Sequence, residues 1–210
     1  MKKEPKLKSC VICGNEFKQF KSTQKVCSTP CAIEYAKQKE KEKAEREWRK
    51  EKRQRKEKAN PEIRKKDLQK EINKLARKID NYFGYNCIDC GKHYTGQIDA
   101  AHFKGVGAND TIRFNLHNIH SARANCNQYN KEQHHRDYPK GLEDRYGKDY
   151  LEMVQGLSLE YKHLGLTLYE IKEALKKTRK AIKEFDELIK GNLDGSMARA
   201  KFNLIIGIYE

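Results

Sequence analysis

The sequence predicts an α+β protein that is predominantly helical and carries two small metal-binding modules. Seven cysteines fall mostly in close pairs, and long stretches outside them consist of charged, helix-forming residues. Of the 210 residues, 37% are hydrophobic and 36% charged, which leaves too little apolar material for one large globule. We expect a zinc module over 1–31, a charged helical arm with a packing helix over 32–82, a small cysteine- and histidine-rich core over 83–138 and a helical region over 139–210.

The first module is predicted from Cys10-x2-Cys13 and Cys27-x3-Cys31, which have treble-clef-like spacing. A segment this short cannot fold on an apolar core alone, and four thiolates on one Zn²⁺ would supply the missing stability. The start of the chain leads into no apolar signal region, and no run is apolar enough to span a membrane. We therefore expect a cytoplasmic protein, in which paired cysteines bind metal rather than form disulfides.

The charge is concentrated in the N-terminal part. The formal net charge is +15, and residues 1–82 hold 26 basic against 13 acidic residues, whereas residues 83–210 hold 19 against 17. An excess of this kind attracts polyphosphate, which favours a nucleic-acid partner over a merely solvated basic face.

The arm has two parts. Lys37–Lys58 holds half as many acidic as basic residues and one large apolar residue, Trp48, so we expect a solvated single helix or disorder. After Asn60-Pro61, which is typical of a helix start, apolar residues recur at helical spacing over 68–82. That face can pack within the chain or against a second copy.

The C-terminal region is predicted to be helical. Apolar residues share one side of Gly141–Val154, and Thr167-x2-Glu170 resembles a capping box that opens a helix to about Lys190. The apolar end, Phe202–Tyr209, should dock onto another part of the protein.

The informative stretch runs from Cys87 to Asn127. Cys87-x2-Cys90 before Gly91 is typical of a zinc knuckle, and Cys126 is a distant third ligand. Between them Asp99 and His102 lie three apart near the end of a predicted strand. A carboxylate binds hard cations such as Mg²⁺ and a neutral imidazole can take a proton from water, the two requirements of phosphodiester hydrolysis.

The order Cys-x2-Cys, Asp-x2-His, Cys-Asn resembles the ββα-metal (HNH) nucleases and the endonuclease VII-type junction resolvases. A longer set of motifs in this stretch, together with the layout of the whole chain, resembles the lambdoid phage NinG family. Its matching residues are Asp99-Ala-Ala-His102, Arg113-Phe114-Asn115, Asn118-Ile119-His120 and Cys126-Asn127-Gln128.

The resemblance implies His102 as general base and Asp99 with Asn127 as ligands of a catalytic Mg²⁺ or Mn²⁺. It implies Asn118 as the residue that orients the histidine, with Asn115 as the alternative. The family usually has a cysteine three residues before Cys126.

This chain has Arg123 at that position. The second zinc site therefore has three clear thiolates, and His120 or His93 would complete the tetrahedron. His134-His135, just beyond the motif, is expected at a solvated helix end.

The residues favour a metal-dependent endonuclease. The resemblance implies that it acts on branched DNA, such as a Holliday junction or D-loop, in phage recombination within the host cytoplasm. A resolvase acting on a four-way junction is expected to form a homodimer and to meet phage or host recombination proteins. The alternatives are a non-catalytic zinc protein that binds DNA as a recombination mediator, and a zinc-dependent RNA-binding protein.

Overall fold

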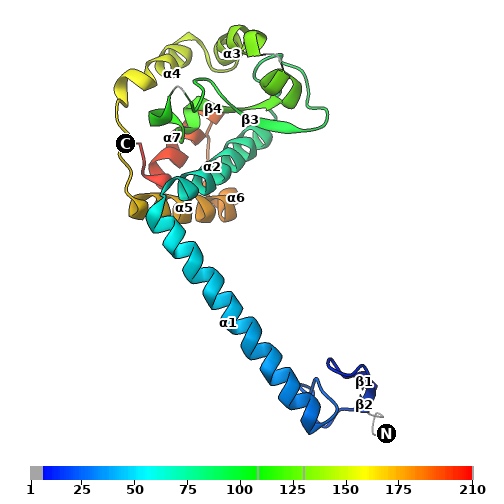
Figure 1. The fold of residues 1–210 in the computed structure, drawn as a ribbon. Coiled ribbons are helices and arrows are strands. Elements are labelled where there is room, and N and C mark those ends of the chain that lie inside the picture. Colours follow the sequence, from blue (N-terminus) through cyan, green and yellow to red (C-terminus); the bar gives the residue numbers. More distant parts are fainter. Residues whose placement is uncertain (1–6, 108, 130, 210) are drawn as a thin grey trace. The chain divides into compact units, whose positions relative to one another are not determined.

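The computed structural model describes residues 7–107, 109–129 and 131–209 (Figure 1). Two compact units divide between Ala59 and Asn60, inside the predicted 32–82 arm, so the charged helix and the packing helix belong to different units. The predominantly helical α+β class is confirmed, with two antiparallel two-stranded sheets. No helix in these ranges is long and apolar enough to cross a membrane.

The first unit combines a β-hairpin with one long helix. Strands β1 (Leu7–Ser9) and β2 (Glu16–Lys18) pair with Lys8 opposite Phe17, and α1 spans Thr29–Ala59. Side chains 36–56 of α1 are all exposed, which confirms the solvated helix among the two expectations for the arm. Ion pairs within the helix, such as Lys39–Glu42, stabilise α1, although each exposed pair contributes little to stability.

The second unit is helical apart from one hairpin. Its elements are α2 (Glu62–Tyr82), β3 (Ile98–His102), short 3-10 turns at Asp110–Ile112 and Leu116–Asn118, β4 (Ile119–Arg123), a π-helical turn at Asn125–Tyr129, α3 (Lys131–Tyr146), α4 (Lys148–Glu160), α5 (Leu168–Lys183), α6 (Phe185–Leu188) and α7 (Gly195–Ile206).

Helix α2 forms the spine of this unit. Leu68, Ile72 and Leu75 are fully buried in a core shared with α5 and α7, so the predicted apolar face packs within the chain. At its start Asn60 Oδ1 accepts a hydrogen bond from the Glu62 amide at 3.0 Å, in line with the predicted helix start. The apolar face of α2, which could have packed against a second copy, is therefore already buried within the chain.

The β3–β4 hairpin lies between α2 and α3. The Ser121 amide donates to Asp80 of α2 at 2.6 Å, and the Tyr138 hydroxyl of α3 donates to the Ala101 carbonyl at 3.0 Å. Ala101 and Tyr138 also belong to a second buried core, which includes Cys87 and Leu142. The hairpin is thus held on both faces.

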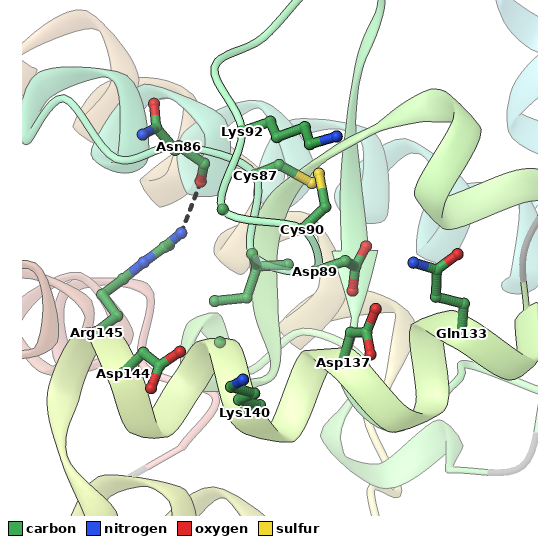
Figure 2. A pocket seen from close by; sticks show the side chains of 13 residues that line it. Asn86, Cys87, Asp89, Cys90, Lys92, Gln133, Asp137, Lys140, Asp144 and Arg145 are labelled. Atoms are coloured by element: carbon green, nitrogen blue, oxygen red, sulfur yellow. Dashed lines mark hydrogen bonds between the residues drawn. The ribbon is translucent and has the colours of Figure 1, made fainter.

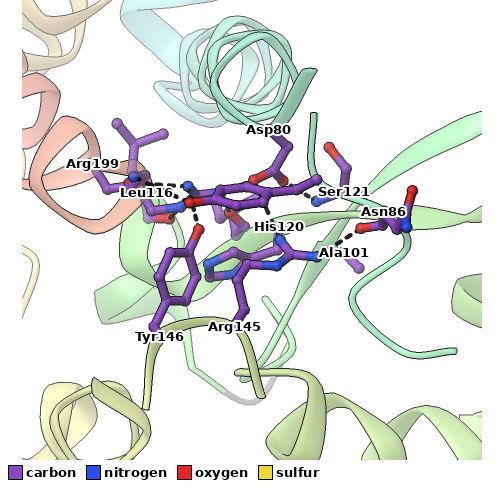
Figure 3. A network of polar contacts seen from close by, with 12 residues as sticks. Asp80, Asn86, Ala101, Leu116, His120, Ser121, Arg145, Tyr146 and Arg199 are labelled. Carbon is purple, nitrogen blue, oxygen red and sulfur yellow. Dashed lines mark hydrogen bonds and ion pairs between the residues drawn. The ribbon is translucent and has the colours of Figure 1, made fainter. Parts of the chain in front are cut away.

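A buried ion pair joins four elements of the unit (Figure 3). Arg199 of α7 donates to Asp80 Oδ1 at 2.6 Å, and both side chains are fully buried. Arg199 also donates to the Leu116 carbonyl and to the hydroxyl of Tyr146 in α3, while Arg145 lies 3.5 Å from the Asp80 carboxylate. Because the guanidinium of Arg199 has hydrogen-bond partners on several sides, its charge and that of Asp80 are compensated. The pair ties α2, the hairpin, α3 and α7 together.

The C-terminal helices differ in detail from the prediction. The capping box at Thr167 is confirmed, but α5 ends at Lys183 and the short α6 follows. The apolar stretch over 141–154 is broken at Gly147, whose φ of +89° ends α3 and starts α4. The chain end does dock, since the Phe202 ring stacks on Phe185 at 5.3 Å.

Candidate metal and nuclease site

The four N-terminal cysteines come together in the first unit. Cys10 and Cys13 lie on the turn between β1 and β2, Cys27 lies in the following loop, and Cys31 lies in the first turn of α1. Their sulfur atoms lie within 4.8 Å of one another, with Cys13–Cys27 at 3.5 Å and Cys27–Cys31 at 3.8 Å. Tetrahedral zinc with Zn–S bonds of about 2.3 Å needs sulfurs about 3.8 Å apart, so this donor set fits Zn²⁺.

Backbone hydrogen bonds shape this turn. Gly14, with a φ of +77°, donates to the Cys10 carbonyl at 2.9 Å, and the Cys10 amide donates to Asn15. The backbone amide of Cys13 stabilises the Cys10 thiolate and lowers the pKa of that thiol to about 6. A thiol that ionises readily is suited to metal binding.

A second thiol cluster lies in the other unit. Cys87 and Cys90 flank a tight turn that ends at Gly91 (φ +65°), and Cys126 joins them from the π-helical turn. The three sulfur atoms lie within 4.8 Å of one another. The turn packs on α3 at Gly141, where an added Cβ would lie 1.7 Å from the Ile88 carbonyl oxygen.

The histidines expected to complete this cluster do not reach it. His120 is fully buried, and its Nδ1 lies 3.0 Å from the Tyr138 hydroxyl. The Nδ1 atom of His93 contacts Asn86 Oδ1 instead, at 3.3 Å. Across the described ranges, no other His, Cys, Asp or Glu belongs to the group, so the proposal of His120 or His93 as a fourth ligand is wrong for this structure. The ring of His120 is instead held by Tyr138 of α3.

Arg123 lies beside the cluster. Its amide donates to Cys87 Sγ at 3.2 Å, and its guanidinium donates to Thr95 at 2.9 Å. Burial raises the pKa of Cys90, but amide and side-chain donors, Arg123 among them, lower it overall. The cluster therefore holds three thiols with a cation next to them.

Asp99 and His102 project from opposite faces of β3, because they are three residues apart in a strand. Asp99 Oδ2 accepts hydrogen bonds from Asn127 at 3.0 Å and Gln128 at 2.6 Å, whereas His102 contacts Gln69 of α2 at 3.1 Å. Asn127 connects the two, since it also lines a pocket of about 250 Å³ with His102. Asn127 is thus close to both Asp99 and His102.

The Asp99 carboxylate is held in its ionised form. Burial raises its pKa, but the amides of Asn127, Gln128 and Gln97 outweigh that effect and lower the pKa below its ordinary value. The amide nitrogens of these residues face Asp99, so the carboxylate is the oxygen ligand that this site offers to Mg²⁺ or Mn²⁺ as it stands.

His102 is a neutral imidazole. Burial lowers its pKa from 6.5 to about 4. The Gln69 amide nitrogen donates to Asn73 Oδ1 at 2.8 Å and lies 3.1 Å from His102 Nε2, so Nε2 is the acceptor. The ring proton then lies on Nδ1, which agrees with the hydrogen bond between the ring and the Arg113 backbone.

The two candidate asparagines have different surroundings. Asn118 is fully buried, accepts from the Lys104 amide at 2.8 Å and donates to the Lys104 carbonyl at 3.1 Å. Asn115 instead accepts from Asn203 of α7 at 2.9 Å. Asn118 thus fixes the segment directly after His102 through its backbone, with no direct contact to the ring.

His134 lies beside the candidate site, a position that the sequence did not reveal. Only 8% of it is exposed, which corrects its expected position at a solvated helix end. Its ring lies 2.8 Å from the Asp89 carboxylate in the knuckle and hydrogen-bonds the His102 backbone. Burial lowers its pKa, but Asp89 raises it above the ordinary value. The spacing of polar residues gave no sign of this link between knuckle, α3 and β3.

The knuckle and α3 also border a cavity of about 610 Å³ (Figure 2). Asp89, Asp137 and Asp144 face it together with Lys92 and Lys140. At one end Arg145 donates to the Asn86 carbonyl at 2.6 Å. His117, the remaining histidine of the motif, lies elsewhere and contacts Tyr150.

Residues 2–187 match the family model described as Bacteriophage Lambda NinG protein. A "Protein ninG" of Escherichia phage 933W is 32% identical over 168 residues, which cover 72% of this chain and 82% of that protein. The "Protein ninG" of Escherichia phage lambda is 31% identical over 43% of each chain, and that of Salmonella phage P22 is 34% identical over 30% of each. No solved structure matches significantly. The chain therefore belongs to the bacteriophage lambda NinG family.

Proposed function

We propose that this protein is a metal-dependent endonuclease that cleaves branched DNA in phage recombination. One observation carries the proposal. Asp99 and Asn127 meet at 3.0 Å beside a pocket that a neutral histidine, His102, also lines. A carboxylate and an amide oxygen can hold a divalent cation and an imidazole can activate water, which together suffice for phosphodiester hydrolysis, and the match to the NinG family supports the phage context.

His102 would act as the general base. Its ring is neutral at physiological pH, and Nδ1–H is held by the Arg113 backbone, so Nε2 presents the lone pair. The Gln69 amide caps that lone pair, and it must turn aside for a water molecule to donate its proton to Nε2. Arg113 donates to Gln69 Oε1 at 3.1 Å, which holds the cap in place until substrate arrives.

Asp99 and Asn127 would hold the divalent cation. Asp99 is ionised, and the amides of Asn127 and Gln128 can present their oxygen atoms after a rotation about the terminal bond. When bound, Mg²⁺ or Mn²⁺ supplies the positive charge that stabilises the leaving oxygen.

The surrounding residues position these groups. Asn118 fixes the backbone after His102, and His134 ties the His102 backbone to the knuckle through Asp89. The thiols of Cys87, Cys90 and Cys126 close the knuckle, and we propose that zinc occupies this cluster as well as the N-terminal one.

The basic residues of the first unit would supply DNA affinity. Residues 1–82 carry a net charge of +13, and α1 exposes its side chains over 36–56. Since each neutralised phosphate releases counterions, binding should weaken steeply as salt concentration rises. The branch preference and a homodimeric complex remain proposals that follow from the proposed role.

The decisive experiment is cleavage of labelled four-way junction, fork and linear duplex DNA with Mg²⁺ or Mn²⁺. Wild type should cut the branched substrates, and His102→Ala should bind them equally well but cut at least 100-fold more slowly, the usual contribution of a general base. His163→Ala, an exposed histidine far along the chain, is the matched control and should cut normally. Normal cutting by His102→Ala would remove His102 from the mechanism.

A second candidate function is that of a non-catalytic zinc protein that binds DNA as a recombination mediator. Two observations favour it: the second cluster has three thiols beside Arg123, and Gln69 occupies the lone pair of His102. Tight binding of junctions without cleavage under either cation would support this candidate. Competition by single-stranded and duplex RNA in the same assay tests the RNA-binding alternative, which a marked RNA preference would favour.

A further inference from the structure

The loop that follows β2 is an ordered part of the zinc module. Gln24 donates to the Val26 carbonyl at 3.0 Å and its Oε1 accepts from the Phe20 amide at 2.9 Å, while Gln19 donates to the Gln24 carbonyl at 2.6 Å. The Val11 amide, in the turn between the first two cysteines, donates to the Lys25 carbonyl at 3.1 Å. These bonds fix the loop to the thiol cluster.

This fixed loop presents one aromatic ring to solvent. Phe20 is 96% exposed, the highest value among the large apolar residues of the described chain. Burying a phenylalanine ring would stabilise the fold by about 1.5–3 kcal/mol, so a ring held in water contributes nothing to folding. Val11, whose amide is bonded to the same loop, is also 54% exposed.

Lysines lie close to Phe20 along the chain. Lys18, Lys21 and Lys25 are exposed on the same loop and its flanks, and residues 17–33 include no acidic residue. Protein interfaces are depleted in lysine at their centres, whereas sites for single-stranded nucleic acid combine aromatic rings with basic residues. The composition of this surface therefore favours a nucleic acid over a protein.

We propose that Phe20 stacks on an unpaired base at the branch of a DNA substrate while Lys18, Lys21 and Lys25 contact the adjoining phosphates. The interior of a paired duplex offers no open base face, so this contact would distinguish a branch with unpaired bases, such as a fork, from paired duplex DNA. The choice of DNA rests on the proposed function, whereas the stacking contact follows from the loop itself. The N-terminal module is then the part of the chain that recognises the branch.

The test compares binding of zinc-loaded, full-length protein to a junction with unpaired bases and to paired duplex, without added Mg²⁺ so that no DNA is cut. Phe20→Ala should bind the junction about 5- to 150-fold more weakly, the range for loss of one stacked base, and bind duplex almost unchanged. Zinc content should not change, because the ring is almost wholly in solvent. Leu159→Ala, which removes a 75%-exposed side chain from the other unit, is the control.

A spectroscopic variant checks the contact directly. Trp48 is the only tryptophan, so Phe20→Trp in a Trp48→Phe background reports on position 20 alone. Its fluorescence should be quenched by the junction and not by duplex. Equal binding of the junction by Phe20→Ala, or fluorescence that the junction leaves unchanged, would overturn the proposal. Neither readout depends on cleavage, so failure of the nuclease proposal would show separately in His102→Ala.

Discussion

Replacing Gly141 by alanine tests whether the knuckle must pack directly on α3. The new Cβ would lie 1.7 Å from the Ile88 carbonyl oxygen and 2.9 Å from its carbon, whereas real Cβ atoms essentially never approach within 3.0 Å. The knuckle or the helix must therefore move by at least 1.3 Å, the difference between 3.0 and 1.7 Å. Ile88 is 1% exposed and belongs to the second core, so there is little room for that shift.

Two opposing effects set how much stability Gly141→Ala should lose. Overpacking of this kind costs about 1–3 kcal/mol, and the backbone contact places Gly141 at the upper end. Alanine gains about 1 kcal/mol over glycine inside a helix. The net loss should be about 2 kcal/mol, which for a unit of this size lowers the melting temperature by roughly 4–8 °C.

The assay is thermal and urea unfolding followed by circular dichroism. Gly156→Ala in α4 is the control, because its added Cβ meets nothing within 4 Å. That variant should gain about 1 kcal/mol from helix propensity alone. If Gly141→Ala were as stable as wild type while Gly156→Ala gained stability, the close contact between knuckle and helix would be refuted.

Three further predictions concern the ion pair, the base and the metal. Asp80→Ala leaves the buried Arg199 charge unpaired and should lower the free energy of unfolding, measured in urea, by about 3–5 kcal/mol. Adding Arg199→Met should restore part of that stability. A loss below about 1 kcal/mol in Asp80→Ala would contradict the idea that Asp80 compensates the Arg199 charge. The pKa of His102 is about 4 in the folded protein and 6.5 in the unfolded chain, so the unfolded chain binds the proton more tightly. The contribution of His102 to stability is therefore complete above pH 6.5 and is lost as the pH falls towards 4. Its NMR signal, assigned with His102→Gln, should show no titration above about pH 5; a midpoint near 6.5 would disprove the buried neutral ring. Zinc analysis should find one ion fewer in Cys13→Ser than in the wild type. Cys126→Ala should also lose one ion, and an unchanged zinc content in that variant would show that the second cluster binds no zinc.

Local patterns were sufficient for several elements. The Thr167 capping box and the helical spacing of Leu68, Ile72 and Leu75 predicted α5 and the buried face of α2, because both depend on neighbours within a turn or two. The spacing of Cys10 and Cys13 likewise predicted the N-terminal thiol cluster, since a short turn brings both sulfurs to one point.

Contacts between distant elements could not be predicted in this way. Sequence order placed His120 near Cys126, but its ring contacts Tyr138 and does not belong to the thiol cluster. His134 and Asp89 are 45 positions apart, and no pattern marks their contact. The cap of Gln69 on His102 depends on the packing of α2 against the hairpin.

The residue pattern alone predicted most of the helices, the close cysteine pairs, the basic N-terminal part and the set of residues from Asp99 to Asn127 that matter for the proposed chemistry. Which of these residues meet depends on how distant elements pack, because a strand alternates its side chains and a helix several dozen residues away supplies the partners. That is why Asp99 and His102 lie on opposite faces of β3 and why Asn127 is the residue that joins them.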